Sequence, residues 1–192
     1  MIELTLFVPI DYGSGIGLTG LSPATIEALT AACTALNVRT DDSDVVAFNL
    51  ADIPALGMFT KDARRWKSEF LATHLERSVQ VFMSNAPNSI NEARTIRDEL
   101  AGKNIIPTKI IIFCDRFHAM RLRLIWPYFF PDSEIEYRTG RYIRNGDYAQ
   151  IFVRHPLTWA LVNIGGMLAM RAVADVFGKP RMIRWFAGIR QP

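Results

Sequence analysis

The sequence predicts an α/β fold, a three-layer Rossmann-like domain with about five mostly parallel strands and helices on both faces. Strand-like and helix-like segments alternate along the whole chain, which is typical of a parallel sheet whose strands are joined by right-handed crossovers. Residues 110–113 are four consecutive bulky apolar residues. Such a run indicates a strand that is covered by helices on both faces, as in a parallel sheet.

The first half of the chain contains two expected strands and two expected helices. Ser22 has the chemistry of an N-cap, and Pro23 suits the first position of the helix that follows. Glycines dominate the connection before this helix. The expected segments are the strand Ile2–Ile10, the loop Asp11–Leu21, the helix from Ser22 to about Leu36, the strand Asp44–Leu50, the loop Ala51–Thr60 and the helix Lys61–His74.

The second half repeats the alternation three times. Ser89-Ile90-Asn91-Glu92 has the form of a capping box at a helix start, and Pro127 and Pro131 are expected to break the chain. Alternating Ile135 and Tyr137 indicate an edge strand. The expected segments are the strands Ser78–Met83, Thr108–Cys114 and Ser133–Arg138, the helices Ser89–Gly102, Arg116–Trp126 and Pro156–Phe177, and a loop that reaches about Gln150.

Composition is that of one ordinary globular domain over residues 1–192. Hydrophobic residues make up 49% and charged residues 21% of the chain, which argues against disorder. Cys33 and Cys114 sit in apolar patterns and are expected to be buried free thiols in a reducing compartment. The start, Met1-Ile2-Glu3-Leu4, lacks the basic region of a signal peptide. We therefore expect a cytoplasmic protein.

Charge is unevenly distributed along the chain. Residues 1–137 hold 13 Lys and Arg against 17 Asp and Glu, a net charge of −4, whereas residues 138–192 hold 9 against 2, a net charge of +7. A basic segment attracts phosphate or acidic surfaces, although it can equally be a solvated face. The basic tail 178–192 combines arginine with Trp185 and Phe186. We expect it either to contact a membrane surface or a partner subunit, or to fold back over the domain.

Two function classes have little support in the sequence. The basic tail comes with no recognition motif, so no nucleic-acid partner is expected. The three histidines lie far apart and lack the spacing of a metal site, so no metal is expected. The apolar run Leu157–Met170 is shorter than the roughly 20 residues that a membrane span needs, and we interpret it as a buried helix.

A glycine motif lies between the first strand and the first helix. Gly15-Ile16-Gly17-Leu18-Thr19-Gly20 has the G-x-G-x-x-G form, in which backbone N–H groups approach a phosphate. The glycines lie well past the strand end and lack an acidic residue at the expected distance. A flexible Gly13–Gly20 loop is the alternative interpretation. Asp11 and Asp52, near the ends of the first two strands, are candidates for binding ribose hydroxyls or for a general base.

Polar side chains also follow the third strand. Asn85, Asn88, Ser89, Asn91 and Glu92 could hold an anionic or sugar-like ligand at the helix start. The alternative is local, since Ser89 and Glu92 can cap their own helix and asparagines suit turns. Capping accounts for Ser89 and Glu92 but does not account for the three asparagines together.

The strongest cluster follows the fourth strand, where Asp115, His118 and Arg121 crowd the start of the next helix. His118 and Arg121 are three residues apart and share one helix face. Two cations beside the positive end of a helix repel each other unless an anion is present, so we expect the pKa of His118 to fall. A neutral imidazole can then act as a base or an acceptor. Asp115 can alternatively serve only as the N-cap.

These clusters resemble the bacterial YdcF/SanA-type family, a domain family of poorly defined function. Members carry a Ser/Asn-Thr-x-Glu-Asn segment at a helix start and, later, an apolar strand ending in Ser/Thr-x-x-His-x-x-Arg. Asn88–Ala93 and Cys114–Arg121 resemble these motifs, and the match covers about residues 84–139. Departures are a Ser for the Thr, a reversed Glu-Asn order, and Thr25 where the family has an Arg. The resemblance implies a Rossmann-like fold with a ligand pocket at the strand ends. Some members are linked to S-adenosylmethionine binding, and others are linked to cell-envelope processes with membrane-anchored chains.

The leading hypothesis is a small-molecule-binding protein, with catalysis left open, whose ligand carries an anionic or nucleotide-like group. S-adenosylmethionine and a nucleotide are the cofactor candidates. Arg121 would pair with the anion, His118 would exchange a proton, and Asn88, Ser89 and Asn91 would orient the ligand. One alternative is a transferase or hydrolase that acts on a phosphorylated cell-envelope precursor. Another is an interaction protein with a vestigial pocket. The sequence leaves the oligomeric state open.

Overall fold

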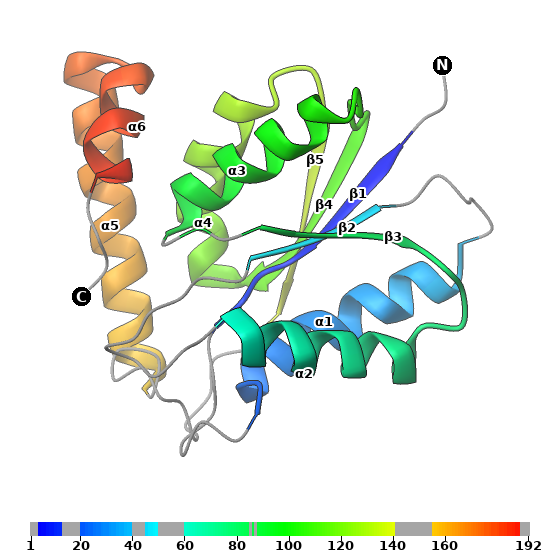
Figure 1. Cartoon of the computed structure of the whole chain (residues 1–192). Coiled ribbons are helices and arrows are strands. Elements are labelled where there is room, and N and C mark those ends of the chain that lie inside the picture. Colours follow the sequence, from blue (N-terminus) through cyan, green and yellow to red (C-terminus); the bar gives the residue numbers. More distant parts are fainter. Residues whose placement is uncertain are drawn as a thin grey trace.

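Five strands form one parallel sheet in the computed structural model, in the order β3-β2-β1-β4-β5 (Figure 1). The structure describes residues 4–12, 20–39, 45–49, 60–84, 86, 88–140 and 155–188. The strands are β1 (Thr5–Pro9), β2 (Val45–Asn49), β3 (Gln80–Ser84), β4 (Lys109–Asp115) and β5 (Glu134–Gly140). All four pairings are parallel. The predicted α/β fold is therefore confirmed, with β5 at an edge as expected.

Helices cover both faces of this sheet. In Figure 1, α1 (Pro23–Asn37) and α2 (Thr60–His74) lie below it, and α3 (Ser89–Gly102) and α4 (Arg116–Phe129) lie above it. The chain moves outward from β1 through β2 to β3 and then returns to place β4 on the other side of β1. The order of strands reverses between β1 and β4. In open α/β sheets ligands bind at the carboxyl ends of the strands beside such a reversal.

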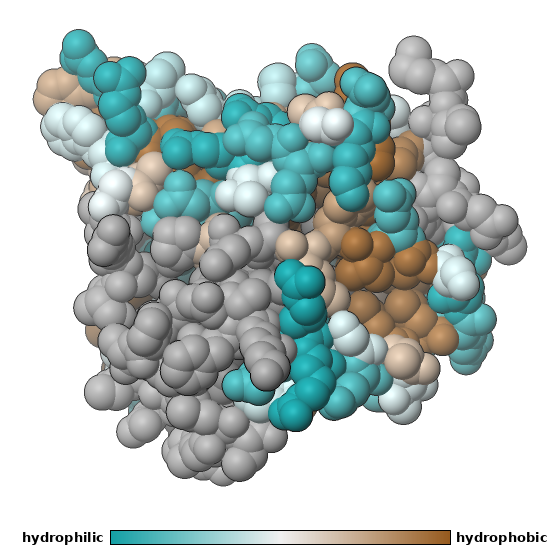
Figure 2. Space-filling model, viewed as in Figure 1, coloured by the Kyte–Doolittle hydropathy of each residue, from teal (hydrophilic) through white to brown (hydrophobic). Residues whose placement is uncertain are grey.

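The core lies around the two central strands. Leu6, Phe7 and Val8 of β1 are fully buried, as is the run from Ile110 to Cys114 of β4. Rings from the two strands stack, with the centroids of Phe7 and Phe113 6.1 Å apart. Burial of both strand faces confirms the interpretation of residues 110–113. Figure 2 shows hydrophilic side chains over α3 and hydrophobic surface around β3 at the opposite edge from β5.

Helix α4 continues through Pro127, where the sequence predicted a break after Trp126. Proline removes one N–H donor and crowds the preceding turn, which usually ends a helix. Here Trp126 and Phe129, on either side of the proline, are both buried in the core. The backbone N–H of Phe130 also donates to the Trp126 carbonyl at 3.0 Å. Packing on both sides therefore keeps the last turn helical.

Helix α5 (Pro156–Phe177) has the predicted bounds but is not a buried helix. Trp159, Asn163 and Met170 face the domain and are buried, whereas Leu161 and Leu168 are 62% and 57% exposed. Leu157, Val176 and Phe177 are also exposed. By length and composition alone the helix could cross a membrane. The interpretation as a buried helix is thus correct for only one face, because α5 lies on the outside of α4.

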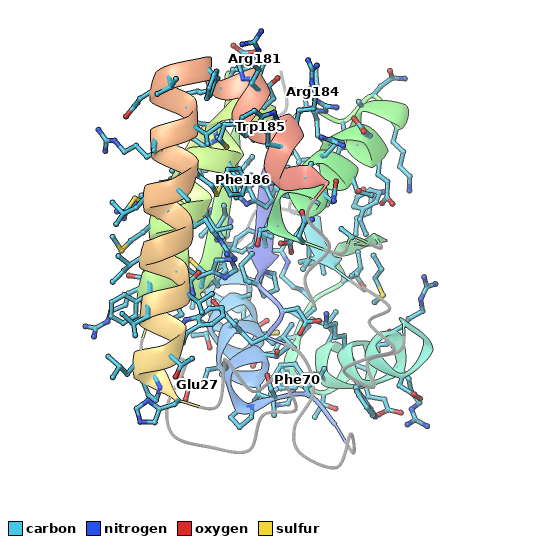
Figure 3. The ribbon with its side chains drawn as sticks, turned by 90° about the vertical axis from the view of Figure 1, so that its left-hand side faces the viewer. Glu27, Phe70, Arg181, Arg184, Trp185 and Phe186 are labelled. Carbon is cyan, nitrogen blue, oxygen red and sulfur yellow. The ribbon has the colours of Figure 1, made fainter. Side chains whose placement is uncertain are left out.

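The described part of the basic C-terminal segment folds into helix α6 (Lys179–Ala187). Met182 and Ile183 are buried against the rest of the protein, and Arg181 and Arg184 are exposed. Figure 3 shows the two arginines pointing outward, while Phe186 lies between α5 and α6. The described residues of this segment fold back over the domain, and contact with a membrane surface or a partner subunit stays a prediction.

Candidate functional site

The described residues that the sequence analysis selected meet at the carboxyl edge of the sheet, where β1 and β4 end. They come from the ends of these strands and from the first turns of α3 and α4. They are Asp11, Asn88, Ser89, Asn91, Glu92, Asp115, His118 and Arg121. Asp52, Asn85 and residues 13–19 of the glycine loop lie outside the described residues. The structure brings the other candidate residues together at this edge.

Ser89 and His118 are in direct contact at the centre of the site. His118 Nε2 lies 3.0 Å from Ser89 Oγ and 3.2 Å from Arg121 Nη2. A guanidinium can only donate hydrogen bonds, so Nε2 must offer its lone pair to Arg121. In a neutral imidazole the proton is then on Nδ1. The Ser89 hydroxyl therefore donates to Nε2.

The imidazole of His118 is held neutral. Burial lowers its pKa well below the ordinary value of 6.5, and the positive charge of Arg121 acts in the same direction. Rings of Tyr12 and Trp159 meet the imidazole edge-on at 5.9 and 5.5 Å between centroids. Nδ1 is buried, with no hydrogen-bond partner among the described residues. The predicted fall of the pKa is confirmed, but burial is its largest cause.

Asn88, not Ser89, is the N-cap of α3. Its side-chain Oδ1 accepts hydrogen bonds from the backbone N–H of Ile90 and Asn91, at 3.1 and 3.0 Å. The expectation that Ser89 and Glu92 form a capping box is therefore wrong. The boundary shifts by one residue because Asn88 adopts the extended backbone that an N-cap needs. As a result, the Ser89 hydroxyl is available to His118.

Glu92 lies one turn further along α3 and is buried. Burial raises its pKa to about 8, Asp11 acts in the same direction, and Lys67 and Arg121 act against it. At pH 7 the side chain is mostly protonated. Its Oε1 has no hydrogen-bond partner within the part of the chain that the structure describes.

A buried ion pair beneath the site joins β1 to α2. Lys67 Nζ lies 2.5 Å from Asp11 Oδ2, and the lysine side chain is only 1% exposed. Thr25 Oγ1 donates to the other oxygen of Asp11 at 3.0 Å. Sequence reasoning missed Lys67. The available signal was its spacing from Phe70 and Leu71, which puts the lysine on the inward face of α2.

Asp115 caps α4 and also holds α5 in place. Its Oδ1 accepts from the backbone N–H of Phe117 at 2.9 Å, which confirms the N-cap interpretation. The same oxygen accepts a hydrogen bond from Trp159 Nε1 at 3.1 Å. The backbone N–H of Asp115 donates to the Tyr12 hydroxyl. Trp159 is a second residue that sequence reasoning missed. A tryptophan in an apolar helix signals a buried N–H that needs an acceptor.

Asn88 and Asn91 together hold the end of α6. Their Nδ2 atoms lie 3.4 and 3.1 Å from the carbonyl oxygen of Ala187. These contacts explain why two amides follow each other at the start of α3. They also bring α6 over the first turn of α3, where it closes one side of the site.

A pocket of about 100 Å³ opens between α3, α4, α5 and α6. One side carries the polar side chains of Asn88, Ser89 and Arg121. The rest of the lining is Ile90, Ile125, Gly166, Met170 and Phe186. A cavity of roughly 150 Å³ holds benzene, so this pocket suits a small group and not a whole nucleotide.

Arg121 lies against Gly166 of α5, where a Cβ atom would make ordinary van der Waals contact with the arginine side chain. A Cβ atom there would stand 3.6 Å from Arg121 Cδ and 3.7 Å from Nη1. Burial lowers the pKa of Arg121, while Tyr12 and Glu92 raise it. Its Nε is buried and has no hydrogen-bond partner among the described residues. The guanidinium is thus held in place mainly by packing and by His118.

Comparison with known proteins gives no relative: no family model, no curated protein and no solved structure matches the chain. The resemblance to the YdcF/SanA-type family therefore stays a prediction. Among the described residues, no group of three or more His, Cys, Asp or Glu side chains is arranged to hold a metal ion.

The first prediction concerns the buried ion pair. Lys67→Met leaves Asp11 buried without its cation, so we expect the free energy of unfolding to fall by about 3–5 kcal/mol. The measurement is urea denaturation at pH 7. Arg65→Met on the same helix is the matched control, because Arg65 is exposed and its contact with Asp62 is 3.9 Å long. The free energy of unfolding of the control should change by less than about 0.5 kcal/mol. Equal losses in the two variants would contradict the assignment.

The second prediction follows from the raised pKa of Glu92. The unfolded chain releases this proton near pH 4.5 and the folded protein near pH 8, so ionisation destabilises the fold as the pH rises between these values. Glu92→Gln removes this effect. Its stability relative to the wild type should rise by up to about 1.4 kcal/mol per pH unit between pH 5 and 8. Denaturation at several pH values measures the slope. Glu69→Gln, at an exposed position of α2, is the control, and a flat difference for Glu92→Gln would refute the prediction.

Proposed function

We propose that the protein binds a small molecule with an anionic group and an apolar part in the pocket between α3, α4, α5 and α6. His118 lies behind the described lining of this pocket, and in this proposal it exchanges a proton through Ser89, which belongs to the lining. The observation that supports this most is Arg121. Its guanidinium lines the pocket and forms no ion pair with any carboxylate among the described residues. A half-buried positive charge of this kind favours an anionic ligand.

The charges of the groups around Arg121 also favour an anionic ligand. The positive charge of Lys67 is matched by Asp11 at 2.5 Å. Glu92 is mostly protonated at pH 7, and His118 is neutral. Of these groups, Arg121 is therefore the one whose charge is not balanced by a neighbour. An anion that binds here neutralises it.

Side chains, not backbone amides, supply the recognition in this proposal. Asn88 already accepts from the N–H groups of Ile90 and Asn91, which would otherwise attract an anion to the start of α3. Arg121 then provides charge and paired donors, and Ser89 provides a hydroxyl.

The other half of the lining selects an apolar part of the ligand. Ile125, Met170 and Phe186 offer hydrocarbon and ring surface opposite the polar side. The volume of about 100 Å³ limits the enclosed group to a few heavy atoms. This favours short carboxylates and phosphate monoesters over whole nucleotides or S-adenosylmethionine, of which only a part would enter.

The third prediction tests this ligand class. Butyrate and butyl phosphate should raise the apparent melting temperature of the protein, because a ligand that binds the native state stabilises it. Butanol, which has a four-carbon chain but no charge, should not raise the melting temperature. Differential scanning fluorimetry detects binding, and calorimetric titration gives the affinity.

Arg121→Gln is expected to weaken butyrate binding about 10- to 100-fold, the effect of losing a charged hydrogen bond. Arg116→Gln is the matched control, since Arg116 begins the same helix but is exposed and stacks on Phe117. If neither anion binds, or if Arg121→Gln binds butyrate as tightly as Arg116→Gln does, the proposal is wrong.

A further inference from the structure

We propose that Ser89 is a nucleophile activated by His118, and that the pocket hydrolyses a small carboxylic ester that carries an anionic group. This inference rests on the ligand site proposed above and names its reaction. The observation behind it is the hydrogen bond between Ser89 Oγ and His118 Nε2, whose two atoms lie 3.0 Å apart. Asn88 performs the capping of α3, so the Ser89 hydroxyl is not used by its own helix.

The direction of this hydrogen bond is set by Arg121. Because the guanidinium donates to Nε2, that nitrogen carries a lone pair and the Ser89 O–H points at it. A serine hydroxyl aimed at the unprotonated nitrogen of an imidazole, at 3.0 Å, is the arrangement in which histidine removes the proton during attack. Ser89 also lines the pocket, so its oxygen can reach a bound molecule.

Arg121 gives the site a built-in dependence on substrate charge. The guanidinium disfavours a proton on His118, since both would be positive and they lie 3.2 Å apart. An anionic group that binds to Arg121 offsets this charge and strengthens His118 as a base. The uncharged ester should therefore react more slowly than its anionic counterpart.

The reaction runs in two balanced steps. In the first, Ser89 Oγ bonds to the carbonyl carbon, its proton moves to His118 Nε2, and the C–O bond to the alcohol breaks. His118 then gives this proton to the departing alkoxide. In the second, a water molecule loses a proton to His118 and attacks the acyl-serine. Ser89 leaves, takes the proton back, and the carboxylic acid is released.

The pocket limits the acyl group to a short chain. Ile125, Met170 and Phe186 enclose an apolar space beside Ser89, within a total volume of about 100 Å³. Acyl chains of a few carbon atoms fit such a space.

His118 lacks the carboxylate that completes a catalytic triad. Its Nδ1 has no hydrogen-bond partner among the described residues, and the rings of Tyr12 and Trp159 orient the imidazole instead. Loss of that carboxylate in serine proteases slows turnover by roughly 10⁴-fold. A slow reaction is expected here, so covalent labelling of the nucleophile is a sharper test than turnover.

The fourth prediction uses a fluorophosphonate probe, which forms a stable bond to an activated serine with loss of fluoride. Incubation with the folded wild-type chain should give a single adduct, located on Ser89 by tandem mass spectrometry. Ser89→Ala should not be labelled, and His118→Gln should be labelled at least 100-fold more slowly. Ser133→Ala is the control, because Ser133 donates to the Pro107 carbonyl away from the pocket. It should react like the wild type.

An adduct on another residue, or no adduct on the folded wild type, overturns the proposal. The position of the adduct on the wild-type chain tests whether Ser89 is the nucleophile, even if a variant fails to fold. Butyrate binding separates the two proposals. If butyrate binds in an Arg121-dependent way but Ser89 is not labelled, the nucleophile is wrong and the ligand site stands. If neither butyrate nor butyl phosphate binds and Ser89 is not labelled, both proposals fail.

Discussion

A continuous set of polar contacts across the carboxyl edge of the sheet is the interaction on which the site depends. It links five elements or their ends through six residues: Lys67, Asp11, Thr25, Tyr12, Asp115 and Trp159. The contacts join α2 to the end of β1, β1 to α1 and β4, and β4 to α5. Buried polar groups are costly unless they are paired, so these contacts strongly favour one arrangement of the helices around the strand ends. Within this set Asp115 also caps α4, whose first turn meets that of α3 through His118 and Ser89.

The same contacts determine which charge is left for a ligand. Lys67 and Asp11 neutralise each other, and burial keeps Glu92 and His118 largely uncharged at pH 7. Arg121 retains its charge beside an imidazole that must accept its hydrogen bond. Anion binding and the direction of the hydrogen bond between Ser89 and His118 are in this account two consequences of one guanidinium. The outer face of α5 lies apart from this chemistry, since its exposed leucines point away from the pocket lining.

The sequence pattern was sufficient to predict the fold class and the buried strand at residues 110–113, but not the contacts that build the site. The run at residues 110–113 identified a strand buried on both faces, and the polar side chains that follow this strand and the third strand marked two of the strand ends that meet in the site. Local sequence rules were insufficient where the role of a side chain depended on contacts with residues distant in the sequence. Asn88 and Ser89 both suit an N-cap, and only their contacts with α6 and His118 separate them. The burial of Lys67 required knowing that Asp11 lies opposite it.

The tautomer of His118 is the property that tests the account most directly. Nuclear magnetic resonance of the ¹⁵N-labelled histidine rings, with His118→Gln used for assignment, reports which nitrogen carries the proton. We predict a proton on Nδ1, a bare Nε2, and a ring that stays neutral at pH 6.5 and below. A proton on Nε2, or a positively charged ring at pH 7, would contradict both the direction of the Ser89 hydrogen bond and the role given to Arg121.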